Sequence, residues 1–296
     1  MWHFLINFVA VKFWRLFIMA MVGILAWGVP MPVRAQIVQQ PGPAETPLSP
    51  DSIRRQMDLG PYFGLYKDNY FIIGAPVGYR ATKENSDVKF QISISQRLTR
   101  ATLPFHTYLY LFYTQKVFWN VFENSMPMSD LNFNPGIGLT KPLYVRDRFI
   151  GKASLILEHE SNGRDGLQSR SWNKVSFAAN IVIDPTLTVH GKVWIPIVDG
   201  GQNKDILDYC GIYQVGTQFQ SLNRRFGMSI LLAKRRGWNF NYNTTVELSW
   251  RIRAKDNQFL FLQYYNGYGE GLLAYKEFHS MLRVGMCIKP RIFSEY

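Results

Sequence analysis

The chain has 296 residues, a formal net charge of +12, 47% hydrophobic residues and 15% aromatic residues. It can bury a large core, yet no stretch after residue 35 approaches the roughly 18 apolar residues that a membrane helix needs, which excludes a helical membrane protein. The net positive charge is not accompanied by a basic helix, a zinc-ligand spacing or an RNP-like segment. It therefore favours anionic lipid headgroups over nucleic acid as a partner. Scattered loop charge is the plainer alternative.

Residues 1–35 predict a secretory signal peptide. Lys12 and Arg15 precede a short apolar run, and the small residues around Ala35 suit signal peptidase. A retained membrane anchor is the alternative, and the shortness of the run disfavours it. Residues 36–58 are rich in Pro, Gln and Ser and predict a disordered polar leader.

Residues 59–296 predict one all-β domain. Apolar and polar side chains alternate strictly in residues 88–95, 246–253 and 282–289, which is the period of a β-strand. About 20 residues per strand with its connection allow about twelve strands, an even number as in bacterial membrane barrels.

A transmembrane antiparallel β-barrel is favoured over a soluble β-sandwich, which would alternate in the same way. The polar faces carry charges and amides, as a lumen does, and the segments reach the roughly 10 residues that tilted membrane strands require. Aromatic residues that cluster near expected strand ends are interpreted as an interfacial girdle, namely Tyr62, Phe63, Tyr66, Tyr70 and Phe71.

One expected strand presents a histidine and a serine on the face that would contact lipid. Because side chains at positions i and i+2 point to the same side, His159 and Ser161 continue the apolar stripe of Ala153, Leu155 and Leu157. On the next strand, Asn173 shares its face with apolar residues, while Trp172 and Lys174 point inward. Three polar groups are therefore expected together on the outer face of the barrel.

Ser, His and an amide can form a catalytic triad, in which the imidazole takes the hydroxyl proton and the third group orients the ring. Gly163, in the turn after Ser161, is a candidate donor to an oxyanion. Taken alone, these residues are better explained by a chance tripeptide and an ordinary hairpin turn. Residues 267–270 (GYGE) predict a turn, since no helical pattern follows that a phosphate loop would need.

The sequence resembles bacterial outer-membrane phospholipase A over about residues 60–289. The resemblance is carried by 159–164 (HESNGR) and 169–173 (SRSWN), and by shorter pieces at 68–70, 88–91, 113–116, 132–135 and 267–270. It implies a twelve-stranded barrel in the outer membrane of a Gram-negative bacterium. The implied activity is calcium-dependent hydrolysis of phospholipid acyl esters, as phospholipase A1, A2 and lysophospholipase, with a homodimer as the active form.

The resemblance also implies residue roles. Ser161 would be the nucleophile, His159 the general base, Asn173 the orienting amide, and the Gly163 N–H an oxyanion donor. Calcium would be held by the Arg164 carbonyl and the Ser169 hydroxyl, with Ser125 reaching in from the second subunit. Gln115 matches the family's glutamine at the dimer interface.

Two departures bear on a second calcium site of the family, which uses acidic residues. The chain has Asp165-Gly166 where the family has Ser-Asp, and 201–204 (GQNK) replaces an acidic loop before Asp205. Cys210 and Cys287 are far apart in sequence, which leaves open whether they form a disulfide. The alternative function is a catalytically silent outer-membrane barrel that acts as a pore or scaffold.

Overall fold

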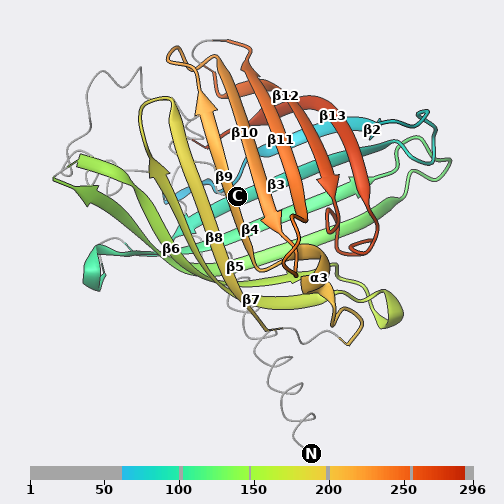
Figure 1. Cartoon of the computed structure of the whole chain (residues 1–296), viewed down its shortest axis with the longest axis horizontal. Helices are drawn as coiled ribbons and strands as arrows, with labels where there is room; N and C mark the ends of the chain where they lie inside the picture. Colours follow the sequence, from blue (N-terminus) through green and yellow to red (C-terminus); the bar gives the residue numbers. More distant parts are fainter. Residues whose placement is uncertain (1–61, 100–102, 147, 198–200, 254–255, 291–296) are drawn as a thin grey trace, which may run out of the picture. The chain divides into compact units, whose positions relative to one another are not determined.

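The computed structural model of the chain describes residues 62–99, 103–146, 148–197, 201–253 and 256–290 (Figure 1). The predicted signal peptide (1–35) and leader (36–58) lie outside the described residues. No helix in these ranges is long and apolar enough to cross a bilayer.

The fold is a ring of antiparallel strands. In chain order the strands are β2 (Asn69–Pro76), β3 (Asp87–Arg97), β4 (Tyr108–Trp119), β5 (Met128–Val145), β6 (Arg148–Ser161), β7 (Ser171–Val182), β8 (Leu187–Ile197), β9 (Tyr213–Gln220), β10 (Phe226–Lys234), β11 (Tyr242–Arg251), β12 (Gln258–Gly267) and β13 (His279–Ile288). Each strand pairs with its neighbours in sequence, and β13 pairs with β2. The described residues therefore form a closed twelve-stranded transmembrane barrel, as predicted, and a two-sheet sandwich is excluded.

The first barrel strand is interrupted. A short strand, β1 (Phe63–Leu65), pairs with β3 beyond the region where β2 pairs with it. Between β1 and β2, hydrogen bonds to Ser93 of β3 take the place of regular strand pairing. The Ser93 carbonyl accepts from the Tyr66 N–H (3.3 Å) and the Ser93 Oγ accepts from the Lys67 N–H (3.1 Å). The Ser93 N–H donates to Asn69 Oδ1 (2.6 Å). The break leaves these backbone groups hydrogen-bonded within the wall.

The alternation in sequence translates into an apolar outside and a polar inside. Along β6, Leu155 and Leu157 are 50% and 56% exposed, whereas Ile156 and Glu158 between and beyond them are 1% and 7% exposed. An exposed apolar band on a closed barrel is stable in contact with lipid, because in water this apolar surface would stay hydrated at a cost in free energy.

The predicted aromatic girdle is only partly correct. Tyr62, Phe63 and Phe71 are exposed, but Tyr66 and Tyr70 are buried and stack on Phe112 and Phe261 inside the barrel. Tyr70 and Phe71 are adjacent in a strand and must point to opposite sides, so they could not both belong to an outer girdle.

Ion pairs and a folded loop occupy the interior. Glu270, in the β12–β13 connection, accepts hydrogen bonds from Lys89 (2.9 Å) and Arg283 (2.6 Å), and Arg283 also pairs with Asp87 (2.7 Å). The predicted turn at 267–270 is present, but its glutamate is buried as the partner of two cations. Burial of each charge is compensated by an opposite charge in hydrogen-bond contact.

A small apolar cluster joins the β12–β13 connection to the barrel wall. Leu272 and Tyr275 of the β12–β13 connection pack with Trp172 of β7 and with Ile206 of the short helix α3 (Ile206–Cys210). Backbone N–H groups of Leu272 and Leu273 also donate to side chains of β5, Asn132 and Asp130. We refer to α3 and residues 268–278 together as the plug.

Candidate functional site

The site lies on the outer face of the barrel where β6 and β7 meet the connection 162–170. His159 and Asn173 are cross-strand partners, as are Ser161 and Ser171. The Asn162 N–H donates to the Arg170 carbonyl (3.0 Å), so 162 and 170 are a hydrogen-bonded pair of the ladder. By the alternation of an antiparallel ladder, His159–Asn173 and Ser161–Ser171 are non-hydrogen-bonded pairs, whose side chains lie closest together.

The structure brings His159 and Asn173 into direct contact. The His159 Nδ1 and the Asn173 Oδ1 are 2.8 Å apart. An amide oxygen only accepts, so this contact assigns the ring proton to Nδ1 and leaves Nε2 as the basic nitrogen. The predicted partners His159 and Asn173 are therefore in hydrogen-bond contact.

Ser161 lies two residues from His159 on the same face. Its register partners form one row across five strands of the outer face, consisting of Ile92, Gln115, Phe133, Ser161 and Ser171. The backbone beside it is held by Asn134, whose Nδ2 donates to the His159 carbonyl (2.8 Å). The row puts Ser161 and Gln115 in register on β6 and β4, with Phe133 of β5 between them.

Asn162 organises the connection that follows Ser161. Its side chain is 2% exposed; Oδ1 accepts from Arg170 N–H (2.9 Å) and Arg164 N–H (3.3 Å), and Nδ2 donates to the Gln168 carbonyl (2.8 Å). Gly163 has a φ of +66°, and a Cβ there would lie 3.0 Å from the Phe133 ring. Both the conformation and the space favour glycine at this position.

The predicted calcium ligands lie in two connections. Arg164 and Ser169 flank a single 3₁₀ turn, η2 (Gly166–Gln168), and Ser125 lies exposed in the β4–β5 turn. The Arg164 guanidinium joins the two regions, because it donates to Gln168 Oε1 (2.7 Å) and to the Ser129 carbonyl at the start of β5 (2.7 Å). Within the described ranges, no three His, Cys, Asp or Glu side chains cluster as a metal site.

Asp205 is already engaged by the plug. Its carboxylate pairs with Lys276 (2.6 Å) and accepts a hydrogen bond from the Tyr275 hydroxyl. Burial alone would raise the pKa of Asp205, but the hydrogen bonds from Lys276 and Tyr275 outweigh it and lower the pKa. The Asp205 carboxylate is therefore held by two partners within the chain.

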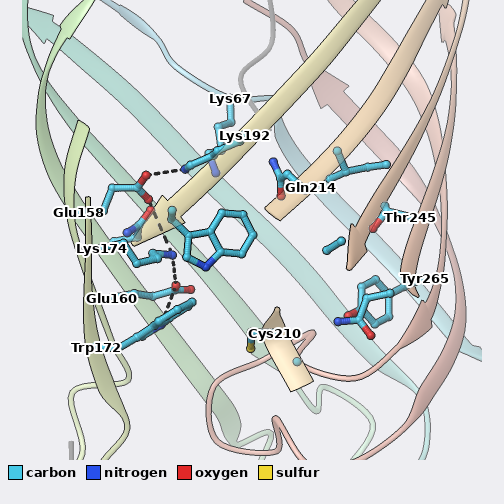
Figure 2. A pocket seen from close by; sticks show the side chains of 16 residues that line it. Lys67, Glu158, Glu160, Trp172, Lys174, Lys192, Cys210, Gln214, Thr245 and Tyr265 are labelled. Atoms are coloured by element: carbon cyan, nitrogen blue, oxygen red, sulfur yellow. Dashed lines mark hydrogen bonds and ion pairs between the residues drawn. The ribbon is translucent and has the colours of Figure 1, made fainter. Parts of the chain in front are cut away.

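An ionic cluster lies on the inner face of β6, β7 and β8 (Figure 2). Glu160 accepts from Lys174 (2.8 Å) and from the Trp172 indole (3.1 Å), while Glu158 pairs with Lys192 (2.5 Å). These side chains line a cavity of about 210 Å³, and Lys67 and Cys210 line it as well. The alternation of side chains predicts the inward positions of Trp172 and Lys174, but no sequence motif indicates a function for this cluster.

The two cysteines do not form a disulfide. Cys210 lies in α3 and Cys287 is buried in β13, and both are free. The question that sequence spacing left open is therefore answered by the fold.

Comparison with known proteins places the chain among phospholipases. The family model for phospholipase A1 matches residues 67–288. Phospholipase A1 of Proteus vulgaris is 32% identical over 205 residues, which is 68% of each chain. Phospholipase A1 of Escherichia coli is 31% identical over 210 residues, covering 68% of this chain and 69% of the relative.

Solved structures agree. Outer membrane phospholipase A from Escherichia coli matches with a TM-score of 0.67 and 25% identity, over 78% of this chain and 99% of that one. The Salmonella typhi outer membrane phospholipase dimer with bound calcium matches with a TM-score of 0.68 and 25% identity, over 80% and 96%. An asparagine-to-alanine active-site mutant of the Escherichia coli protein matches with a TM-score of 0.65 and 26% identity, over 76% and 91%.

The fold defines a transmembrane barrel whose candidate site faces lipid. The chain belongs to the phospholipase A1 family, and it is a phospholipase.

Proposed function

We propose that the chain hydrolyses phospholipid acyl esters in the outer membrane through a triad of Ser161, His159 and Asn173 on its lipid-facing surface. The observation that carries the proposal is the 2.8 Å contact between His159 and Asn173 on the outer face, with Ser161 beside it. In the Escherichia coli relative, a change of asparagine to alanine is an active-site mutation, which supports an asparagine in this role.

In this mechanism Ser161 Oγ attacks the ester carbonyl carbon while His159 Nε2 takes its proton. The carbonyl oxygen becomes an oxyanion, to which the Gly163 N–H donates a hydrogen bond. When the bond to the glycerol oxygen breaks, His159 returns the proton to the leaving lysophospholipid, and the acyl group stays on Ser161. Water, deprotonated by His159, then releases the fatty acid.

Calcium suits the oxygen donors at the end of this site. The Arg164 carbonyl, the Ser169 hydroxyl and Ser125 of a second subunit are hard oxygen ligands, and calcium needs 6 to 8 such ligands, so water would supply the remainder. Bound there, calcium would add positive charge near the oxyanion. The calcium-bound dimer of the Salmonella typhi relative supports this part of the proposal.

The homodimer would enclose an acyl chain between two apolar outer faces. Gln115 lies on that face in the same cross-strand row as Ser161, and its Oε1 accepts a hydrogen bond from the Tyr113 hydroxyl (3.1 Å). We place Gln115 at the interface, with export through a cleaved signal peptide (residues 1–35) preceding insertion. The plug and the interior ion pairs occupy the barrel interior, which disfavours the pore form of the alternative function.

The direct test is fatty-acid release from phosphatidylethanolamine in mixed micelles by the purified full chain. Release is expected in calcium, loss in EDTA, and recovery when calcium is restored. Folding is checked by the change in gel mobility on boiling, which a closed barrel shows because it has no free edge. No fatty-acid release in calcium by correctly folded protein would contradict the proposal and favour a silent barrel.

Asn173→Ala is expected to lower kcat by about 10²-fold, less than loss of Ser161, because a neutral amide contributes orientation without charge. A matched control exists on the same strand. Asn180 makes a similar contact with His190 (3.0 Å), but this pair is buried inside the barrel. Asn180→Ala should leave kcat near that of wild type; equal losses in both variants would make Asn173 merely structural.

Gly163→Ala is expected to lower kcat by about 10²-fold, the size of the effect of losing one oxyanion donor. A Cβ at this position meets the Phe133 ring and would displace the Gly163 N–H. Gly166 is the matched control, because its φ is also positive (+60°) but nothing lies within 4 Å of a Cβ there. If both alanine variants lost the same activity, backbone strain alone would explain it.

A further inference from the structure

Asn203 reaches from the β8–β9 connection to the first residue of β7. Its side chain is 0% exposed. The Asn203 Nδ2 donates to the Ser171 carbonyl (2.9 Å), and its Oδ1 accepts from the Ser171 N–H (3.3 Å). One side-chain amide thus satisfies both backbone groups of Ser171.

This arrangement reproduces the pairing that a neighbouring strand would provide. In the described residues, the last pair of the β7–β8 ladder is Asn173–Ile197. Ser171 lies two residues before Asn173 in β7, so the backbone N–H and C=O groups of the two residues point to the same side. An asparagine side chain carries one amide donor and one carbonyl acceptor side by side, as a peptide group does, and continues the ladder at this point.

The Asn203 backbone is fixed by the plug. Its carbonyl accepts from the Ile206 N–H (3.1 Å) in the first turn of α3, and Ile206 is 0% exposed. Ile206 packs with Trp172, the residue between Ser171 and Asn173. Asn203 therefore joins a buried, well-packed element to the end of β7 that carries the candidate site.

We propose that Asn203 is a positioning residue for the phospholipase site. It holds Ser171 and thereby the start of β7, which keeps Asn173 against His159 and closes the connection 162–170 that begins at Ser161. The inference rests on the proposed triad. Asn203 touches no reacting atom, and it lies outside residues 159–173, which contain the triad.

Loss of this clamp should affect the reaction more than substrate binding. Small misplacements of catalytic groups can cost up to about 10²-fold in rate, so we expect Asn203→Ala to lower kcat about tenfold. KM should stay within about twofold, because the apolar surface that binds acyl chains is unchanged. The rate of labelling of Ser161 by a sulfonyl fluoride should fall in parallel with kcat.

Asn243 supplies the matched control. Its Nδ2 donates to the Tyr209 carbonyl (2.6 Å) and its Oδ1 accepts from the Tyr268 N–H (2.9 Å), so it also clamps the plug with one amide, but from β11. Asn243→Ala removes these two hydrogen bonds but leaves the Asn203–Ser171 and Asn203–Ile206 hydrogen bonds in place, so kcat should stay within about twofold of wild type. Asn203→Asp is a second variant of the same size, which keeps the acceptor but places an oxygen against the Ser171 carbonyl.

The experiment measures kcat, KM, labelling rate and heat-dependent gel mobility for wild type, Asn203→Ala, Asn203→Asp and Asn243→Ala in detergent with calcium. Lower kcat and labelling in a folded Asn203 variant, with Asn243→Ala unaffected, supports the proposal. A folded Asn203 variant with wild-type kcat, or equal losses in Asn243→Ala, overturns it. All four proteins retain Ser161, so failure of the triad itself would appear separately, as activity that survives Ser161→Ala.

Discussion

Ser161→Ala is expected to abolish phospholipase activity, with kcat falling by about 10⁴-fold or more, because no other group can form the acyl-enzyme. His159→Ala should produce a loss of similar size. The residual rate would come only from substrate binding and the oxyanion donor. Fatty-acid release from phosphatidylethanolamine micelles measures both effects.

Sulfonyl fluoride labelling separates the two roles. Wild type should be labelled at Ser161, and His159→Ala should not be labelled, since an unassisted hydroxyl is a weak nucleophile. Ser171→Ala is the control, because Ser171 is the cross-strand partner of Ser161 on the same face and its hydroxyl has no assigned role. Labelling that persists without His159 would remove that residue from the role of base.

Ser125→Ala is expected to raise the calcium concentration for half-maximal activity at least about tenfold. Loss of a residue that hydrogen-bonds to a metal ligand typically lowers metal affinity by about 10- to 100-fold. Ser125 is proposed as a direct ligand in a site with few protein oxygens, so its loss should cost at least as much. The maximal rate at saturating calcium should change little, because the triad is intact. Cross-linking of the dimer, followed across the same titration, should shift together with activity.

Asn124→Ala is the control for this variant, because Asn124 is exposed in the same turn. It should leave the calcium response unchanged. Full calcium-independent activity in a species shown to be monomeric would contradict the proposed dimer site. An unchanged calcium response in folded Ser125→Ala would remove Ser125 from the ligand set.

The sequence by itself determined the barrel and the direction of the candidate site. The period of two assigns each side chain to lipid or lumen, so the outward positions of His159 and Ser161 and the inward positions of Trp172 and Lys174 could be predicted. In the structure Leu155 and Leu157, on the same side of β6 as His159 and Ser161, are exposed, and Trp172 and Lys174 line the interior cavity. The same rule, applied residue by residue, would have corrected the girdle, because adjacent residues such as Tyr70 and Phe71 cannot share a face.

Only the tertiary structure decided which distant residues meet. Strand register brings Asn173 to His159 and Ser171 to Ser161, and the fold leaves Cys210 in α3 and Cys287 in β13 without a disulfide. The clamp of Asn203 on Ser171, and the burial of Glu270 between Lys89 and Arg283, join segments that lie far apart in the chain. Local alternation carries no information about such pairs, because they depend on how the ring closes and how the connections fold back across its end.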